Sequence, residues 1–444
     1  MQNDLTQGNL FSNILHFSIP FFLSYFLQTL YGLADLLIVG QYNGADVISA
    51  VSIGSQVMHM FTVMIVGLAM GTTVMIGRTV GSKEEEKKRL VIGNSFTLFM
   101  VLSFLLMIGL SLCVKPILSL LSTPLQSIDE ASKYLRICFL GIPFIVIYNL
   151  FSSIFRGLGD SKSPMIFIAI ACIVNIVLDL IFIGPIHMKA VGAAYATVIA
   201  QVISVLFALI ALTKMKLNLK KNDFKINHET LFSILKIGIP IMVQDGFIQI
   251  SFLIITMIAN QRGVDVAAAV GIVEKIISFL FLVPSSMLST VSTIVSQSMG
   301  AKEEKRAQDT LYYCIGISVG YGLIVALICQ IAAESILALF TSDLTVITLG
   351  SQYLHSYVLD CVVAGVHFCF SGFFAACNYS ILSFVHNLAS IILARIPGAY
   401  FASIWYPDTL FPMGLAAPIG GMISIVICLI AYRLIRKKLF TGMA

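Results

Sequence analysis

The chain has 444 residues, of which 58% are hydrophobic and only 11% are charged, and its formal net charge is +5. A soluble protein of this length would carry roughly 25% charged residues. The composition therefore excludes an ordinary soluble domain, and basic residues confined to short segments beside apolar runs indicate no nucleic-acid partner. The first residues, MQNDLTQGNLFSNILHFSIP, lack the basic start and the small-residue cleavage site of a signal peptide.

Apolar runs of about 20 residues, the length that a helix needs to cross a bilayer, recur along the whole chain. Lipid offers no partner to a free backbone N–H or C=O, and the runs lack the strict alternation of a membrane barrel. The sequence therefore predicts an all-α polytopic membrane protein. Its twelve spans are expected at residues 10–39, 46–77, 90–114, 131–155, 162–185, 190–213, 232–260, 266–297, 307–333, 350–376, 381–404 and 411–435.

Most lysines and arginines fall in loops that would share one side of the membrane. They gather after the second, fourth, sixth and eighth predicted spans and at the end of the chain, with GSKEEEKKR as the densest example. Loops rich in Lys and Arg remain in the cytoplasm. We therefore expect a multi-pass protein of the cell membrane, inner or plasma, with both termini in the cytoplasm.

The chain repeats itself at an offset of 219 to 220 residues. The segment ILHFSIP (14–20) returns as ILKIGIP (234–240), and GSKEEEKKR (81–89) returns as GAKEEKRAQ (300–308). With six spans in each half, both halves point the same way, so this is a parallel repeat about an axis along the membrane normal.

The repeat predicts two six-helix bundles. We expect an N-lobe at residues 1–213, a cytoplasmic linker at 214–231 and a C-lobe at 232–444. Two similar bundles that face each other across a cavity are typical of transporters, whose substrate site lies near the middle of the membrane.

Two polar residues interrupt the apolar run IACIVNIVLDLIFIG. Asn175 and Asp179 are four residues apart, so they share one helix face. Asp35, in LQTLYGLADLLIVG, is the only other acid expected to be buried in this half, and no Lys or Arg lies mid-helix there. A buried carboxylate costs several kcal/mol unless it is paired, protonated or bound to a cation. The pattern predicts a site for H+ or Na+, with Asp35, Asn175 and Asp179 as metal ligands if the ion is Na+.

These polar residues do not recur in the second half. At the repeat offset, Asn175 corresponds to Ala394, Asp179 to Gly398, and Asp35 to Ile255 or a neighbour. Residues that only stabilise the fold should recur in both halves, so the asymmetry favours a functional role. The alternative is a structural polar network, whose further members would be Gln28, Thr29 and Thr197.

The second half carries polar residues of its own inside apolar runs. Asp245 and Gln249 are four apart in PIMVQDGFIQI, and Arg395 comes two residues before Pro397. Arg395 could neutralise a nearby acid, and such pairs are often structural. Residues that could line a central substrate cavity are Gln28, Tyr31, Asp245, Gln249, Glu274, Asp360 and Arg395.

Pro20 lies in the first predicted span, about four helical turns before Asp35. A proline removes one backbone hydrogen bond and permits a kink. We therefore expect Pro20 to act as a hinge that couples ion occupancy to bending of this helix.

No pattern in the sequence indicates an enzyme. The nine cysteines form no CxxC pair, and His59, His355 and His367 are scattered. A paired nucleophile and base, or a His-rich metal cluster, is not evident. Apart from the coupling ion, no cofactor is expected.

Several motifs together resemble the multidrug and toxic compound extrusion (MATE) transporters, and the resemblance covers nearly the whole chain. They are LQTLYGLADLLIVGQYNG, GLAMGTTVMIGRTVGSK, FRGLGDSKSPM, NIVLDLIFI followed by KAVGAAYATVIAQ, and SQSMGAKEEKRAQ. The resemblance implies twelve helices in two six-helix lobes, and export of organic cations against an inward H+ or Na+ gradient.

Compared by position, Asp35 resembles the first-helix carboxylate of the family's N-lobe cation site, and Asn175, Asp179 and Thr197 resemble its other members. Two positions depart from the family pattern. Gly32 stands where many relatives have Asn, and the seventh-helix Glu of some branches is replaced at 248–249 by Ile-Gln. These departures favour the DinF-like branch, whose cation site is in the N-lobe.

The resemblance thus implies a secondary active multidrug efflux antiporter that works by alternating access. Its partners would be small organic, mostly cationic amphipathic compounds and the lipid bilayer, and a monomer is expected. The alternative is a flippase of lipid-linked precursors from the same superfamily. Such flippases usually have more helices and several basic residues in the cavity, where this chain offers only Lys275 and Arg395.

Overall fold

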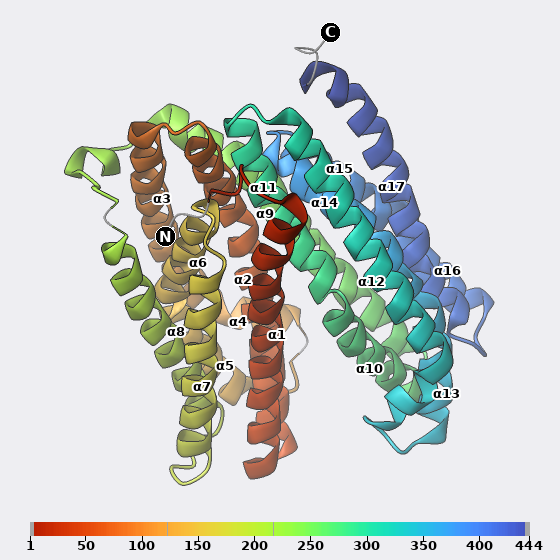
Figure 1. Ribbon diagram of the computed structural model, residues 1–444. Coiled ribbons are helices and arrows are strands. Elements are labelled where there is room, and N and C mark those ends of the chain that lie inside the picture. Colours follow the sequence, from red (N-terminus) through yellow and green to blue (C-terminus); the bar gives the residue numbers. More distant parts are fainter. Residues whose placement is uncertain (1–3, 122, 216, 440–444) are drawn as a thin grey trace. The chain divides into compact units, whose positions relative to one another are not determined.

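The computed structural model describes residues 4–439 except 122 and 216 (Figure 1). The outermost residues of both predicted lobes, and Lys216 of the predicted linker, lie outside the described residues. Within the described part of the chain every regular element is a helix. The all-α prediction is therefore confirmed.

The helices follow one another with short connections. In the first half they are α1 (Leu10–Tyr42), α2 (Ala45–Gly81), α3 (Glu85–Leu112), α4 (Val114–Leu120), α5 (Ile128–Leu140), α6 (Ile142–Gly157), α7 (Lys162–Ile183), α8 (Lys189–Lys214) and η1 (Lys221–Phe224). In the second half they are α9 (His228–Gln261), α10 (Val264–Leu280), α11 (Leu282–Gly300), α12 (Glu304–Ala338), α13 (Leu344–Tyr357), α14 (Leu359–Ala376), α15 (Ser380–Ser390), η2 (Ile391–Arg395), α16 (Ile396–Trp405) and α17 (Phe411–Leu439).

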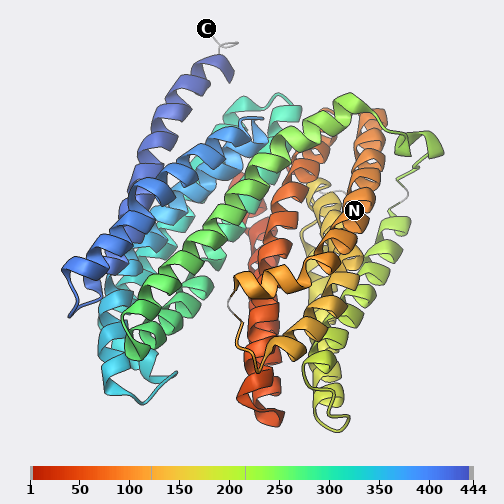
Figure 2. The same ribbon diagram turned by 180° about the vertical axis from the view of Figure 1, so that it is seen from behind.

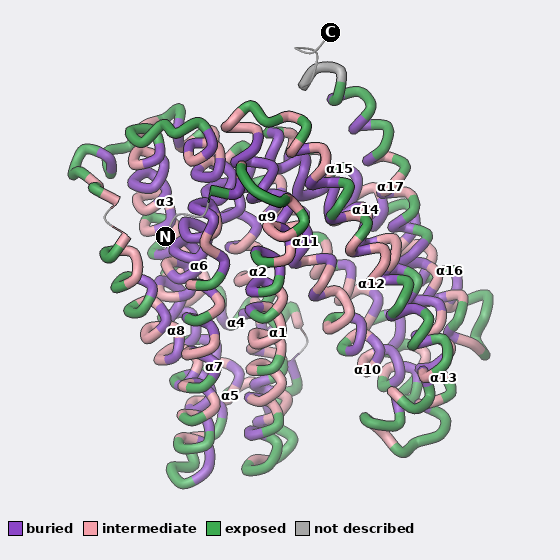
Figure 3. Tube along the Cα trace, in the orientation of Figure 1, coloured by how far each residue is buried: buried purple, intermediate pink, exposed green. Residues whose placement is uncertain are grey.

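Among the described residues, 11 helical stretches are long and apolar enough to cross a membrane, and 12 if the bent pair of α5 and α6 counts as one span. The direction of the helix axis bends by 48° between α5 and α6. Each stretch overlaps one predicted span, so the twelve-helix prediction is confirmed. Many outward-facing side chains are large and apolar: Leu112 is 78% exposed and Ile331 is 79% exposed. Figure 3 shows such exposed positions along many helices. This surface suits lipid rather than water, and the protein is a multi-pass membrane protein.

The chain forms two compact units, and each contains part of the other half's first helix. The first unit contains Ile19–Gly238, and the second contains Leu5–Ser18 and the chain from Ile239 onwards. Helix α1 therefore begins in the second unit and continues in the first, while α9 begins in the first and continues in the second. Pro20 and Pro240 lie within two residues of these two crossing points.

In the first unit, α7 packs along α8, and α2 packs against α5 and α6. The segment before α9, which includes η1, packs against α3. Figure 2 shows this segment in green beside the orange α3. Asn94 donates to the carbonyl oxygen of Asp223 at 3.2 Å and accepts from the backbone N–H of Asn227 at 2.7 Å. A Cβ added to Gly93 would lie 2.2 Å from the same Asp223 oxygen. This segment is therefore a packed part of the first unit.

Helix α2 and the first turns of α9 touch through two glycines. A Cβ on Gly71 would lie 2.3 Å from the carbonyl oxygen of Ile234, and a Cβ on Gly238 would lie 2.4 Å from that of Leu68. Gly71→Ala is expected to lower the free energy of unfolding by about 1–3 kcal/mol, because the backbones must move apart. Thermal unfolding of the purified protein measures the change.

Gly109→Ala is the matched control, since nothing lies within 4 Å of a Cβ at that helical position. It should be neutral or slightly stabilising, because alanine favours a helix more than glycine does. Equal melting temperatures for the two variants would contradict the close contact of α2 with α9.

In the second unit, α11 packs against α12 and α14, and α17 packs against α13 and α14. The segment before α1 also belongs here. The Arg306 guanidinium donates to the carbonyl oxygens of Leu5 at 2.9 Å and Gln7 at 3.0 Å, and the backbone N–H of Leu5 donates to Gln297 Oε1 at 3.2 Å. Both pre-helix segments are thus fixed by side-chain bonds to backbone atoms.

Candidate functional site

Three helices of the first unit each present a row of polar side chains. Helix α1 carries Gln28, Tyr31 and Asp35, which are spaced by three and four residues. Helix α7 carries Asn175 and Asp179, spaced by four. Helix α8 adds Thr197 and Gln201, again spaced by four. Such spacings place each row on one helix face.

The rows meet at two carboxylates. Asp35 is 4% exposed, Asn175 is 1% exposed and Asp179 is fully buried. Asp35 is close enough to interact directly with both Asp179 and Asn175. Within the described part of the chain, no salt bridge includes either carboxylate. The predicted juxtaposition of Asp35 with Asp179 is therefore present in the structure, without a basic partner.

The polar atoms of this cluster lack hydrogen-bond partners. In the described residues they are Asp35 Oδ1, both Asp179 carboxylate oxygens, Asn175 Oδ1 and Nδ2, and Thr197 Oγ1. Buried polar atoms are normally satisfied, so such a group calls for an explanation. Thr29, which the structural-network alternative would need, donates instead to the carbonyl oxygen of Tyr25 at 2.9 Å. Thr29 therefore donates within its own helix and not to the cluster.

The donor set suits a proton or a hard monovalent cation. It consists of carboxylate, amide and hydroxyl oxygens, which are the ligand types that hard cations prefer. No group of three or more His, Cys, Asp or Glu side chains that could hold a metal occurs among the described residues.

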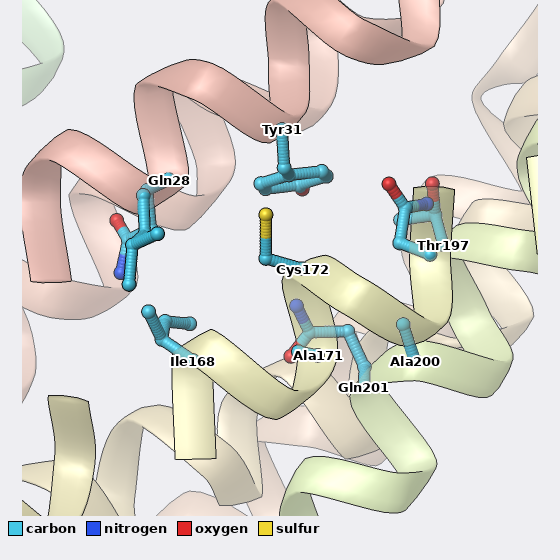
Figure 4. Close-up of a pocket in the computed structure, with 10 residues that line it drawn as sticks. Gln28, Tyr31, Ile168, Ala171, Cys172, Thr197, Ala200 and Gln201 are labelled. Carbon is cyan, nitrogen blue, oxygen red and sulfur yellow. The ribbon is translucent and has the colours of Figure 1, made fainter. Parts of the chain in front are cut away.

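A pocket of about 270 Å³ opens beside the cluster (Figure 4). It is lined by Leu27, Gln28, Tyr31, Ile168, Ala171, Cys172, Asn175, Thr197, Ala200 and Gln201. Only a small part of this space is wide enough for a water molecule, about the room that a single water needs. The pocket therefore suits a small ion or one water better than a whole drug, whose pockets are usually about 300–1,000 Å³. Gln28 and Tyr31, which the sequence suggests as substrate contacts, face this smaller space.

Gln201 lines the same pocket and was missed in the sequence. Its Oε1 atom has no hydrogen-bond partner in the described structure. The signal that could have found it is its spacing of four residues from Thr197 in the segment YATVIAQ.

In the second unit, the structure brings three of the predicted residues together. Arg395 donates to Asp360 Oδ2 at 2.9 Å, and its guanidinium carbon lies 5.5 Å from the centre of the Phe252 ring. The charges of Glu274 and Arg395 also interact, and Glu274 accepts a hydrogen bond from Thr256 at 3.3 Å. The prediction that Arg395 neutralises a nearby acid is borne out by this ion pair.

The other predicted cavity residues, Asp245 and Gln249, are half-buried on α9, the helix that also carries Phe252 and Thr256. Arg395 ends the π-helical turn η2, which interrupts the run from α15 to α16. The second unit therefore has a paired acid where the first unit has unpaired acids.

The family model MatE matches residues 20–181 and 240–401, which together make up most of the chain. The chain is 30% identical over 449 aligned residues to the probable multidrug resistance protein YpnP of Bacillus subtilis, with 99% of each chain covered. It is 25% identical to the probable multidrug resistance protein YoeA of the same organism, with 95% of this chain and 93% of that protein covered.

Among solved structures, the fold is similar to the outward-facing conformation of a multidrug resistance MATE family transporter of the MOP superfamily. The TM-score is 0.92 at 23% identity, and 98% of each chain is covered. The family match at both halves and the full-length relatives agree with the twelve-helix architecture. The chain therefore belongs to the multidrug and toxic compound extrusion (MATE) family of membrane transporters.

Proposed function

We propose that this transporter is a secondary active multidrug efflux antiporter. It exports small organic, mostly cationic amphipathic compounds by alternating access, in exchange for inward H+ or Na+, with both termini in the cytoplasm. Relatives named as multidrug resistance proteins support the substrate class. A flippase of lipid-linked precursors is less well supported, because it would need free basic residues in the cavity. Arg395 is paired with Asp360, and Lys275 is exposed.

The observation that carries this proposal is the pair of buried carboxylates in the first unit, for which the described residues provide no basic partner. Two negative charges a few ångströms apart repel strongly when little water screens them. A proton or Na+ removes the repulsion and draws α1 towards α7. Occupancy of the site therefore changes the relative free energy of two helix arrangements. Coupling of this kind needs a difference of only about 1–3 kcal/mol.

Pro20 gives α1 a point at which it can bend when it moves relative to α7. It lies in α1 next to the crossing from the second unit into the first, and Asp35 follows on the same helix. Because proline removes a backbone hydrogen bond, the helix bends there at lower cost than elsewhere. Bending at Pro20 would move the part of α1 that carries Asp35 relative to its first turns.

The identity of the ion can be tested at Asn175. Asn175→Ala removes a neutral oxygen ligand, which Na+ needs and a proton does not. We expect the variant to lose most Na+-driven transport and to retain part of H+-driven transport. Dye uptake by inverted membrane vesicles, driven by an imposed Na+ or pH gradient in turn, measures both.

Asn149→Ala is the matched control for this test. Asn149 is also buried, but its amide donates to the carbonyl oxygen of Ile145 at 2.8 Å on its own helix. The control should reduce neither type of transport selectively. Equal losses under both gradients for Asn175→Ala would mean that Asn175 is structural and that it does not coordinate Na+.

A further inference from the structure

The internal repeat places Ala394 or its neighbour Arg395 at the position that Asn175 occupies in the first unit. The two family matches end 220 residues apart, at residues 181 and 401. At the turns before α7 and α15 the offset is one residue smaller, because FSSIF (151–155) corresponds to FSGFF (370–374). Gly159 and Asn378, which follow these segments at the same spacing, share a positive φ of 84° and 65°.

The π-helical turn η2 (Ile391–Arg395) accounts for the change of offset. Its hydrogen bonds span one residue more than those of an α-helix, so it accommodates one extra residue. With the offset of the turn at Asn378, Asn175 corresponds to Ala394. With the offset of the end of the family match, it corresponds to Arg395. The position of Asn175 therefore falls on this pair of residues. π turns of this kind are frequent at functional sites.

Around Arg395, the second unit has a set of oxygen atoms comparable to the ion site of the first. Asp360 is 1% exposed, and its Oδ1 atom has no hydrogen-bond partner in the described structure. The same holds for Glu274 Oε1 and for the hydroxyl of Tyr357. The charges of Asp360, Glu274 and Arg395 all interact with Tyr357. One carboxylate thus contacts the guanidinium at 2.9 Å, and a second carboxylate and a phenol oxygen lie within reach of its charge.

We propose that Arg395 is a built-in cation, and that Asp360, Glu274 and Tyr357 form a monovalent-cation site which the protein's own guanidinium keeps filled. An arginine cannot lose its proton in a protein, so this cation is permanent. It is also tethered, so it cannot leave during a transport cycle. The second unit therefore contributes no exchangeable ion, although it retains the acids of an ion site.

The proposed site lies in the second unit alone. Its occupation by Arg395 goes beyond the coupling role proposed for the first unit, and it does not depend on which ion binds there. With Arg395 present, the buried Asp360 carboxylate has a compensating charge. Without it, Asp360 is left uncompensated, and it must take up a mobile cation or a proton.

The test uses the full-length protein with the first-unit acids neutralised, as Asp35→Asn/Asp179→Asn. In this background, Arg395→Asn is compared with the parent by thermal unfolding. NaCl is exchanged for N-methylglucamine chloride at constant ionic strength, and the exchange is repeated at several pH values. We expect a saturable rise of the melting temperature with Na+, or with added protons, only in the Arg395→Asn variant. The absence of any response to Na+ or pH in a folded variant would overturn the proposal.

Two further variants make the result specific. Arg395→Lys keeps a tethered charge and should not respond to Na+. Arg395→Asn/Asp360→Asn removes one acid together with the arginine, and its response to Na+ should be largely lost. A response equal to that of Arg395→Asn alone would show that Asp360 is not part of the site, and would overturn the proposal.

Recovery of folded protein decides the case in which Arg395→Asn is unstable. Membranes are then extracted in Na+ or in N-methylglucamine, and the proposal expects folded protein only in Na+. If neither medium yields folded Arg395→Asn, no mobile cation can replace the guanidinium, and the proposal is wrong.

Discussion

Replacement of Asp35 by asparagine is expected to abolish gradient-driven efflux while the protein still inserts and folds. The substitution keeps the shape of the side chain, so packing against α7 should be preserved. It removes the charge that must be neutralised by H+ or Na+, so the state of α1 no longer depends on the ion. Dye uptake by inverted vesicles under each gradient, with size-exclusion chromatography as the folding check, measures the two effects.

Asp46→Asn is the matched control. It makes the same chemical change at an exposed acid in the first turn of α2, and transport should be unaffected. Asp35→Glu separates two modes of action: it should be impaired less if the carboxylate only carries a proton, and nearly as much if it coordinates an ion tightly. Normal gradient-driven transport by Asp35→Asn would remove the basis of the proposed coupling.

Breaking the buried ion pair of the second unit is expected to have the largest effect on stability. Arg395→Met leaves Asp360 charged and without its partner, at a site where it is 1% exposed. The loss of one partner of a buried pair costs about 3–5 kcal/mol, because a buried charge remains uncompensated. Denaturant titration of the purified protein at neutral pH measures the change against the unmodified chain.

The double variant Arg395→Met/Asp360→Asn should recover most of this loss, because it removes both members of the pair. Recovery separates the electrostatic effect from the loss of contact between the arginine and Phe252. If the double variant is as unstable as the sum of the two single variants, the two side chains do not act as a pair.

Much of the first-unit site could be predicted because the information is local. Asn175 and Asp179 lie four residues apart in one helix, and helical geometry alone places them on one face. Their meeting with Asp35 of another helix followed from the lack of any basic partner in that half. Gln201 was missed because burying an amide in an apolar helix costs less than burying a carboxylate, so a lone amide is a weaker sign of a functional site.

The arrangement around Arg395 was harder to predict for a physical reason. A constant repeat offset assigns Ala394 to the position of Asn175, and only the π turn shows that a residue has been added. Such a turn differs from an α-helix by one hydrogen-bond step and has no strong sequence signature. The sequence also did not predict that the first turns of α1 pack in the second unit and those of α9 in the first. Helix periodicity shows which face is apolar, but not which helix that face will contact.

The crossing of α1 and α9 between units has a consequence for how the protein is made. The ribosome releases Leu5–Ser18 long before Gln297, yet the backbone N–H of Leu5 bonds to Gln297, 292 positions later. The opening stretch must wait for most of the second half to emerge, and contacts of such long sequence separation form slowly. The first unit, in turn, is complete only when Gly238 has been synthesised, well past the junction between the repeats. Neither half of the gene therefore encodes a self-sufficient bundle, and a chain divided between the repeats would have to exchange helix ends to assemble.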